Sequence, residues 1–597
     1  MERFEVKQLS CDVLCVGGSG AAVSAAWTAA RQGKQVILVS KGRTGRSGNA
    51  LMVGGGFGID GYQSRCILGE AQADESFGPD QLVEKIVKSS FYLGDQRLAR
   101  QFVEDAPVMM KEFLTWAKEA RQNFTFVKSG LYAVSGSGVG KAIQQGVREI
   151  PSLTVLDDTA AVDLLTQDGC VHGALCYELY TGNYVAITAK STVLATGGYQ
   201  PHSLKNSISD MTGDGMAMAL RAGARISDME FLLYIPTAVS PPYLKGSILP
   251  YLFTIPIFMP LSFKVRDASG RELSLPDTFS KVPGSNKMLK LIYSYCWTGQ
   301  GTSNEGIRGG LYYDYSEHSD EEICAAFEHF IDHYGRWHRR GTYNGVDLYR
   351  LRDDILRTRR LEFALGNEYS NGGVVIDEHM ATDLPGLFAA GEVTSGLFGA
   401  FRAGDGLTEM LAHGYRAGLS AAEYAGQVGL IPDLSQQAES LVEELEQVRA
   451  RKGGPRSVTL LRRLEQTADE GMGVVRDARR MERALAALDE LEAELARVAI
   501  PGGSRAYDLD FFDYLTLRNL LPCTRAGLTA ALMRRESRGT HIRSDIPQVY
   551  NSLYFYRITH RLAEGRLFQG KIVPAPGPLA PPTEDYDTVA AYLAQLL

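Results

Sequence analysis

A glycine-rich turn near the start of the chain carries residues that could bind a phosphate. The stretch CVGGSGAAVSAA, residues 15–26, follows an apolar run at 13–16 and leads into small residues that favour a helix to about Gln32. A second apolar run covers residues 35–40. Strand, turn, helix and strand in this order bind a dinucleotide pyrophosphate, because the N–H groups and the dipole at a helix N-terminus attract anions. An ordinary strand–helix packing turn is the alternative.

The glycines of this turn match the dinucleotide fingerprint in part. Gly17 fits the tight turn, and Gly18 and Gly20 keep side chains away from the phosphates. Ser19 and Ala22 stand where the second and third fingerprint glycines usually occur. The turn by itself does not decide the ligand, so the other ligand-facing patterns of the chain matter.

Further segments place glycine or an acid where a ligand could meet the backbone. Three glycines occupy 54–56, and ATGG at 195–198 closes an expected strand. Asp214 precedes a helix of small residues, where it could bond ligand hydroxyls, cap the helix, or do both. Glu392 follows an expected strand and is a candidate ribose ligand. Ser40 ends the second strand, where an NAD-binding protein normally has an acid, which argues against NAD.

Length and composition limit the classes of protein to which the chain can belong. Its 597 residues are too many for one hydrophobic core and predict roughly two to four domains. The net charge of −8 argues against nucleic acid as a partner, because phosphate backbones need a basic face. The eight cysteines are scattered without a CxxC pair, which predicts a reducing compartment and no metal or iron–sulfur site.

One apolar run, residues 246–263, raises the question of a membrane. Pro250, Pro256 and Pro260 would break a helix there, so we expect a lid or an interface and no transmembrane segment. The first expected strand begins by residue 12, which leaves no room for a signal peptide. We therefore expect a cytoplasmic protein, either free or peripheral to a membrane complex.

Helix and strand patterns change in blocks along the chain. Strand signals with hairpin turns fill 154–198, aromatic residues and prolines dominate about 229–350, and glycine-rich segments return from Asn367. Amphipathic helices follow Pro432, and the proline-rich end predicts an arm that docks on this chain or on a neighbour. This order predicts an α/β nucleotide-binding domain that is interrupted by an inserted domain and followed by a helical one.

Several of these blocks occur together between residues 12 and 547. They are DVLCVGGSGAA, RSGNALMVGGG, LATGG, TGDGMAMALRAGARISDMEF, EYSNGGVVID with GLFAAGE, GAFRAGDGL and ESRGTHIRSDIP. In content and order they resemble the FAD flavoprotein subunits of the succinate dehydrogenase and fumarate reductase family. The relatives within that family include L-aspartate oxidase and the adenylylsulfate reductase α subunit.

The resemblance implies an α/β fold with a discontinuous, Rossmann-like FAD-binding domain, an inserted α+β capping domain and a C-terminal helical domain. The implied boundaries are 1–228 and 356–430 for the FAD-binding domain, with a helical insertion at about 60–140, then 229–355 for the capping domain, 431–550 for the helical domain and 551–597 for a C-terminal arm.

The resemblance also implies FAD as the cofactor and assigns its contacts residue by residue. The pyrophosphate would lie on the turn formed by Gly17, Gly18, Ser19, Gly20, Ala21 and Ala22. The adenosine end would lie near Ser40, Lys41 and Ala161, and the isoalloxazine near Ser47, Gly54, Gly55, Asp214 and Leu407. Glu392 would bind ribitol or ribose hydroxyls. The remaining implied contacts are Gly42, Ala195, Thr196, Gly197 and Gly404.

Members of membrane complexes attach FAD covalently through a histidine in the segment RSHT. The corresponding residue here is Gly48, so we expect non-covalent FAD. In the family, the histidyl bond raises the flavin potential and permits succinate oxidation. Its absence favours reduction of an acceptor by the flavin, or a different chemistry.

The residues that hold a C4-dicarboxylate in the family are mostly replaced. The two histidines, in HPT and HYTMGG, correspond to Ile235 and Glu368, whereas the arginine after HGAN is retained as Arg402. Like charges at about 4 Å cost several kcal/mol at low dielectric, so Glu368 disfavours a dicarboxylate. We expect one carboxylate or carbonyl on Arg402 and an apolar or cationic remainder. Glu368 is either a general acid or a partner of Arg402.

The expected reaction is hydride transfer between FAD and a C=C or C–C bond next to a carbonyl or carboxylate, with substrates other than fumarate or succinate. Arg402 would orient the substrate, and a capping-domain residue would supply the proton; only Lys287 and Lys290 occur near the family position of that donor. Electrons would come from a soluble donor, from O2, or from a separate iron–sulfur or other electron-transfer subunit. The alternatives are an electron-transfer module without a substrate of its own and an adenylylsulfate-reductase-like α subunit.

Overall fold

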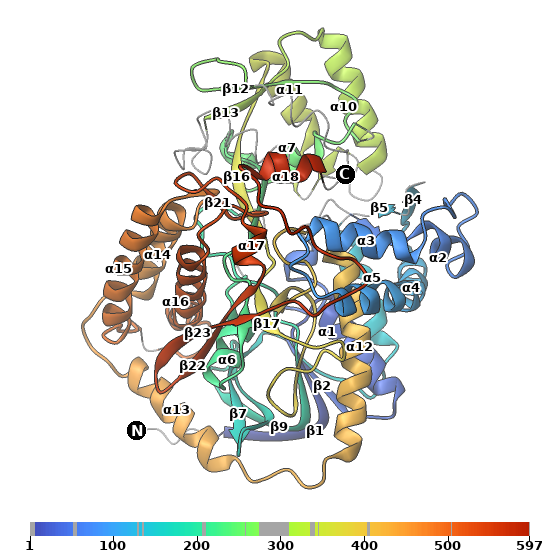
Figure 1. The fold of residues 1–597 in the computed structure, drawn as a ribbon. Coiled ribbons are helices and arrows are strands. Elements are labelled where there is room, and N and C mark those ends of the chain that lie inside the picture. Colours follow the sequence, from blue (N-terminus) through green and yellow to red (C-terminus); the bar gives the residue numbers. More distant parts are fainter. Residues whose placement is uncertain are drawn as a thin grey trace.

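The computed structural model describes residues 6–51, 56–127, 131–133, 136–205, 211–256, 258–273, 310–334, 341–343, 345–402, 406–502 and 504–595. Figure 1 shows a body built around one large sheet, a smaller lobe above it and a group of helices along one flank. Gly54, Gly55, Gly404, Lys287 and Lys290 lie outside the described residues.

The large sheet has the strand order β6-β2-β1-β9-β8-β7, with β18 also paired to β9. These strands are β1 (Val6–Val16), β2 (Val36–Val39), β6 (Thr154–Leu156), β7 (Thr159–Gln167), β8 (Cys170–Glu178), β9 (Tyr184–Leu194) and β18 (Leu387–Ala389). Strands β6, β2, β1, β9 and β18 are mutually parallel. Their inner residues are buried on both faces, as expected for continuous apolar runs in a covered parallel sheet.

Two helices of small residues pack closely together beside this sheet. They are α1 (Gly20–Arg31) and α12 (Gly406–Gln427). A Cβ atom at Gly414 or Gly418 of α12 would lie 2.5 Å from the carbonyl oxygen of Ala21 or Ala25, respectively. Glycines four residues apart lie on one face of a helix, so their spacing sets this close approach. The contact fixes α12, which carries cavity residues described below, against the turn at the end of β1.

An insertion follows the first two strands and packs beside α12. Its elements are β3 (Gly56–Gly58), α2 (Gly61–Cys66), α3 (Pro79–Ser89), α4 (Gln96–Glu119), β4 (Thr125–Val127), β5 (Leu131–Ala133) and α5 (Gly136–Arg148). Arg416 of α12 forms a bidentate ion pair with Asp105 of α4, with both N–O distances at 2.7 Å. This pair joins the insertion to the body.

The upper lobe is built on an antiparallel sheet with the order β11-β16-β13-β12. Its elements are β11 (Leu232–Ala238), α7 (Leu249–Leu252), β12 (Lys264–Asp267), β13 (Leu311–Asp314), α10 (Asp320–Tyr334), α11 (Leu348–Thr358) and β16 (Arg360–Ser370). The apolar run expected to be broken by prolines contains the single short helix α7 in its described part. No described helix combines the length and the apolar character needed to cross a membrane.

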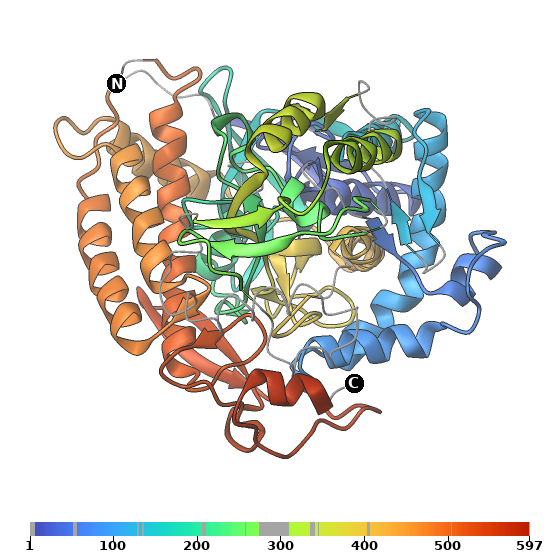
Figure 2. The ribbon, with the colours of Figure 1, turned by 90° about the horizontal axis from the view of Figure 1, so that it is seen from above.

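A small sheet and a helical group complete the body (Figures 1 and 2). The sheet has the order β19-β17-β10-β22-β23, with β10 (Ile226–Ser227), β17 (Gly373–Val375), β19 (Thr394–Ser395), β22 (Arg557–Ala563) and β23 (Arg566–Ile572). The helices along the flank are α13 (Ser435–Arg449), α14 (Ser457–Gly471), α15 (Ala478–Leu495) and α16 (Leu509–Met533). The remaining elements are α6 (Asp214–Arg221), η1 (Asn49–Leu51), η2 (Pro242–Leu244), β14 (Thr342–Tyr343), β15 (Val346–Asp347), η5 (Gly391–Val393), β20 (Val475–Arg476), β21 (Ile542–Arg543), α17 (Asn551–Tyr554) and α18 (Val589–Gln595).

A buried ion network connects the helical group to the body. Glu230, just before β11, pairs with Arg534 at 2.8 Å, and Arg534 pairs with Glu536 at 3.0 Å. Glu536 also pairs with Arg538 at 2.8 Å, and all four side chains are fully buried. Three of the four residues lie at the end of α16 or just after it, so the segment ESRG has a structural role. Removing one partner of a buried pair costs about 3–5 kcal/mol, because the other charge stays buried.

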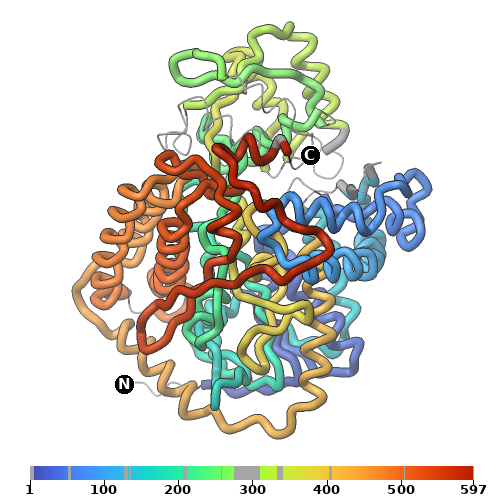
Figure 3. Tube along the Cα trace, viewed as in Figure 1, coloured from blue at the N-terminus to red at the C-terminus, as the bar shows by residue number. Residues whose placement is uncertain are grey.

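The segment after α17 contains a hairpin as well as extended chain. Strands β22 and β23 form the hairpin, and β22 pairs with β10. The chain then crosses the body (Figure 3), where the side-chain amide of Gln96 exchanges two hydrogen bonds with the backbone of Leu579. Helix α18 ends the chain, and the ring of its Tyr592 stacks on Phe91 at 5.1 Å. This end of the chain is therefore held by the insertion.

We predict that Gly17→Ala destabilises the protein more than Gly33→Ala does. Both glycines have positive φ, which costs an L-residue about 1–2 kcal/mol. A Cβ at Gly17 would also lie 2.2 Å from the carbonyl oxygen of Ala195, whereas nothing lies within 4 Å of one at Gly33. Thermal unfolding of the two variants measures the difference. Equal melting temperatures would contradict the steric argument.

Candidate active site

A cavity of about 1630 Å³, partly open to solvent, lies at the carboxyl edge of the parallel strands. Val16, Val39, Ala195 and Ala390, which end or directly follow β1, β2, β9 and β18, line it. Residues of β11, α7 and β16 line it as well, so the upper lobe forms part of its wall. Pockets for small ligands typically measure about 300–1000 Å³, so this one suits a dinucleotide with a substrate beside it.

The N-terminus of α1 presents backbone donors to the cavity. Gly17, Gly18 and Ser19 line the cavity, and the N-cap residue Ser19 makes no side-chain cap hydrogen bond. The first turn of α1 holds no acidic residue. The amide N–H groups of this turn are therefore suited to an anionic ligand.

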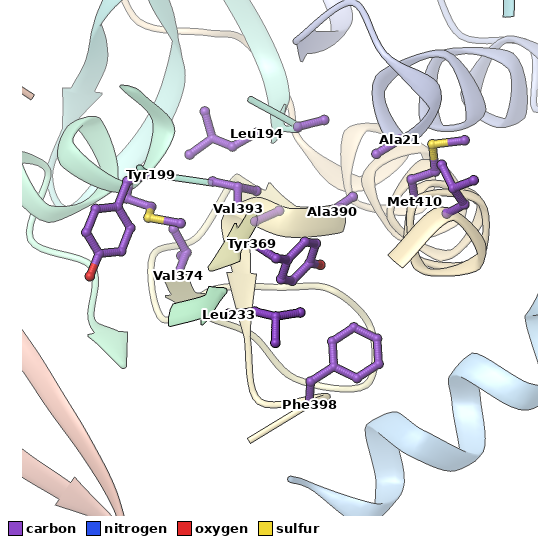
Figure 4. Packing of buried hydrophobic residues seen from close by; sticks show 14 of the residues in the cluster. Ala21, Leu194, Tyr199, Leu233, Tyr369, Val374, Ala390, Val393, Phe398 and Met410 are labelled. Atoms are coloured by element: carbon purple, nitrogen blue, oxygen red, sulfur yellow. The ribbon is translucent and has the colours of Figure 1, made fainter. Parts of the chain in front are cut away.

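Gly20 has a different role from the one expected for it. The expectation was that Gly20 keeps a side chain away from the phosphates. It does not line the cavity, and a Cβ there would lie 2.3 Å from the sulfur of Met410 in α12. Figure 4 shows Met410 beside Ala21, the neighbour of Gly20. The absence of a side chain at Gly20 thus permits helix packing.

Lys41 and Asp214 form an ion pair in the cavity wall. The Lys41 Nζ lies 2.8 Å from Asp214 Oδ2, and Asn519 of α16 donates to Asp214 Oδ1 at 2.8 Å. Burial acts to raise the pKa of Asp214, but Lys41 and these hydrogen bonds outweigh it and lower the pKa below its ordinary value. The N-cap of α6 is Gly213, so the Asp214 side chain does not cap this helix.

This contact changes how two of the expected cofactor contacts relate to each other. Lys41 was expected at the adenosine end of the dinucleotide and Asp214 at the ring end. Because their side chains touch, they face the same part of any ligand, so the two expectations cannot both hold. The physical reason is that α6 begins beside the end of β2, which sequence separation conceals.

Arg402 and Glu368 form a second ion pair on the cavity wall. Arg402 Nη2 lies 2.6 Å from Glu368 Oε2, and the two side chains are only 9% and 15% exposed. The guanidinium also lies over the ring of Tyr369, 4.0 Å from its centre. Burial would lower the pKa of Arg402, but Glu368 more than offsets burial and raises it. Glu368 is therefore placed as the ionic partner of Arg402.

Tyr369 connects Arg402 to a buried acid of α12. Its hydroxyl points toward α12 in Figure 4 and donates a hydrogen bond to Glu409 Oε2. Burial raises the pKa of Glu409 to about 7. The ring of His413 lies 3.8 Å from Glu409, and burial lowers the pKa of His413 to about 3, so this histidine is neutral.

Glu392 lies between the two ends of the wall. It accepts the backbone N–H of Ser370 at 3.1 Å and a side-chain N–H of Asn49 at 3.5 Å. Burial, followed by the charge of Glu368, raises the pKa of Glu392 to about 8. Its carboxyl group is therefore mostly protonated at neutral pH and can donate as well as accept a hydrogen bond.

Comparisons with known proteins match this architecture over most of the chain. The family model "FAD binding domain" matches residues 12–408, and "Fumarate reductase flavoprotein C-term" matches 461–565. The chain belongs to the fumarate reductase and succinate dehydrogenase flavoprotein family. It is therefore an FAD-dependent oxidoreductase with the fold expected from its sequence motifs.

Individual relatives cover nearly the whole flavoprotein. A subunit of the fumarate reductase (CoM/CoB) of Methanothermobacter marburgensis is 28% identical over 91% of this chain and 96% of its own length. The L-aspartate oxidase 1 of Ralstonia nicotianae is 28% identical over 90% of this chain and 96% of its own. A solved variant of the E. coli quinol fumarate reductase has a TM-score of 0.80 and 22% identity, covering 97% of this chain and 99% of that one, which shows a shared fold.

The residues of this flavoprotein fit FAD. Uncapped N–H groups at α1 suit the pyrophosphate, and the cavity runs from there to Arg402. The expected FAD contacts on the cavity wall are Gly17, Gly18, Ser19, Ala21, Ser40, Lys41, Gly42, Ser47, Ala161, Ala195, Thr196, Gly197, Asp214, Glu392 and Leu407. The expected catalytic residues, Arg402 and Glu368, line the same cavity. Gly20 and Ala22 do not line it.

Sequence reasoning missed three polar residues of this wall. Tyr369 follows Glu368 directly and could have been found by that adjacency. Asn49 follows Gly48, at the position after the family's attachment histidine, and bonds both Glu392 and the Glu368 carbonyl. Tyr251 lies in the apolar run that predicted a lid, and nothing in the sequence marks it as a cavity residue.

We predict that the stability of the flavoprotein falls with pH because of Glu392, and that Glu392→Gln reduces the fall. A carboxyl with a raised folded-state pKa stabilises the fold below its ordinary pKa of 4.5 and loses this as pH rises through about 8. The loss between pH 6 and 8.5 should be about 2–3 kcal/mol.

Chemical unfolding of the FAD-free protein at several pH values measures this loss. Glu423→Gln, at an exposed site on α12, is the control and should keep the full pH dependence. An unchanged pH dependence in Glu392→Gln would contradict the role given to burial.

Proposed function

We propose that this flavoprotein transfers hydride between FAD and a C=C or C–C bond next to one carboxylate or carbonyl, and that fumarate and succinate are not its substrates. The observation that supports this most is the ion pair between Arg402 and Glu368. The M. marburgensis relative is named a fumarate reductase, which by itself favours fumarate. The charges of this chain's own cavity argue for another acceptor.

The described cavity wall has no spare positive charge for a dianion. Lys41 is paired with Asp214, and Arg402 with Glu368. A monocarboxylate that displaces Glu368 from Arg402 exchanges one anion for another, which keeps the site balanced. A second carboxylate would lie near Glu368 without a cation, and two like charges at about 4 Å repel by about 4 kcal/mol at an effective dielectric of 20.

The wall beside this ion pair is apolar. Leu233 and Ile235 of β11 and Ile248 beside α7 line the cavity together with Arg402. Burial of an alkyl or aryl group against them gains about 25 cal/mol per Å² of apolar surface. A carboxylate in the same place would lose its water without a hydrogen-bond partner. An enoate with an apolar β-substituent meets both requirements.

The residues of the chain would act by binding and orientation. Arg402 would hold the carboxylate or carbonyl and stabilise the negative charge that develops there during reduction. The upper lobe would exclude water from the reacting bond. When bound, FAD supplies the two-electron hydride chemistry. A separate iron–sulfur or other electron-transfer subunit would supply the electrons, in line with the naming of the M. marburgensis relative as one subunit of its enzyme.

We predict that the reduced flavoprotein is reoxidised by crotonate at least about tenfold faster than by fumarate. Tenfold corresponds to 1.4 kcal/mol, well within the charge penalty above. Photoreduced protein is mixed with each acid without oxygen, and the flavin absorbance is followed in a stopped-flow instrument. The variant Ile235→His with Glu368→His restores the family pair and should shift the preference toward fumarate.

The matched control is Ile248→His, which places the same side chain elsewhere on the apolar wall. It should leave the preference for crotonate in place. Brisk reduction of fumarate by the unmodified protein would contradict the proposal, as would a flavin that neither acid reoxidises.

We also predict that the FAD is not covalently attached. Gly48 lines the cavity and has no side chain that could bond the flavin. Acid precipitation of the yellow protein should release all of the flavin into the supernatant, where absorbance measures it. A pellet that stays yellow after washing would contradict this prediction.

A further inference from the structure

Tyr251 gives the upper lobe an ionisable proton on the cavity wall. Among the described residues, the side chains that this lobe contributes from β11 and from α7 with its flank are Leu233, Ile235, Ile248 and Tyr251. Of these four, only Tyr251 carries an O–H group. It lines the same cavity as Arg402 and Glu368, so it faces the place where the substrate's polar end is expected.

The surroundings of Tyr251 keep its hydroxyl protonated. Burial raises the pKa of Tyr251 above 10, and the charge of Glu368 adds to this, while Arg402 acts in the opposite direction. These are the two charged side chains that act on it, one at the end of β16 and one in the segment before α12. The residue is partly exposed, so water can reach it.

The backbone around Tyr251 is fixed. Its N–H donates to the Ile248 carbonyl at 2.9 Å, and its carbonyl accepts the Thr254 hydroxyl at 2.7 Å. Leu249 and Leu252, on either side, are fully buried. A group held in this way can act at a defined position, which general acid catalysis requires.

We propose that Tyr251 is the proton donor of the reduction, an inference that rests on the proposed function. A hydride from the reduced flavin forms a C–H bond at one carbon of the C=C bond. The electron pair of the π bond takes the Tyr251 Oη proton at the adjacent carbon, next to the carboxylate on Arg402. The substrate gains two hydrogens, the flavin is oxidised by two electrons, and the phenolate regains its proton from water.

The test compares Tyr251→Phe with Tyr243→Phe in the FAD-loaded protein. Tyr243 also belongs to the upper lobe, but it bonds Asp354 and does not line the cavity. Crotonate is the probe. Reoxidation of the reduced flavin gives the rate, and perturbation of the oxidised flavin spectrum by crotonate gives the affinity. Loss of a general acid slows such steps by about 10²- to 10⁴-fold.

We expect Tyr251→Phe to lower the rate at least about 100-fold, with FAD content and crotonate affinity close to those of the unmodified protein. Tyr243→Phe should react at the unmodified rate. The rate of the unmodified protein should not fall on the alkaline side until pH exceeds 10, because the pKa of the donor is raised. If Tyr251→Phe loses FAD, Tyr251→His takes its place and should regain activity below about pH 6.5, where imidazole is protonated.

The outcomes separate this inference from the function on which it rests. If the unmodified protein reduces crotonate and Tyr251→Phe does so within threefold of its rate, Tyr251 is not the donor. Equal slowing of Tyr251→Phe and Tyr243→Phe also overturns the assignment, because it would indicate a general effect on the lobe. If the unmodified protein reduces no enoate, the proposed function fails and this inference fails with it.

Discussion

The parallel pairing of β1 with β9 and of β9 with β18 is the constraint on which the site depends. These strands come from the first, second and fourth hundred residues of the chain, yet their registers end together at Val16, Leu194 and Ala389. Parallel strands present their carboxyl ends at one edge of the sheet, so the loops that follow them meet there. The cavity exists because of that shared edge, and the upper lobe reaches it through β11 and β16.

The ion pair on the cavity wall has two effects that belong together. Glu368 lets the Arg402 guanidinium remain charged in a place where water is scarce, because a buried charge needs a partner. The same carboxylate must give way when an anionic substrate arrives. The site is thus organised before the substrate binds, and its selectivity follows from the charge that it already contains.

Features that depend on local spacing could be predicted from the sequence, whereas contacts between distant segments could not. The turn at Gly17 and the strand end before Glu392 follow from short patterns, and a family resemblance gave the fold. The roles of Gly20 and the pair Lys41–Asp214 depend on how α12 and α6 approach the first turns. Tyr251 has no local signal, because an aromatic residue in an apolar run resembles core.

The pairing of β22 with β10 has a consequence for biosynthesis. Ile226 lies opposite His560, so a strand from the first half of the chain needs one from its last tenth. Domains usually fold as they leave the ribosome, from the N-terminus onward. Here the small sheet waits until translation is almost complete, and the nascent polypeptide carries an unpaired edge until then. Its late closure makes the final strands a checkpoint for a full-length product.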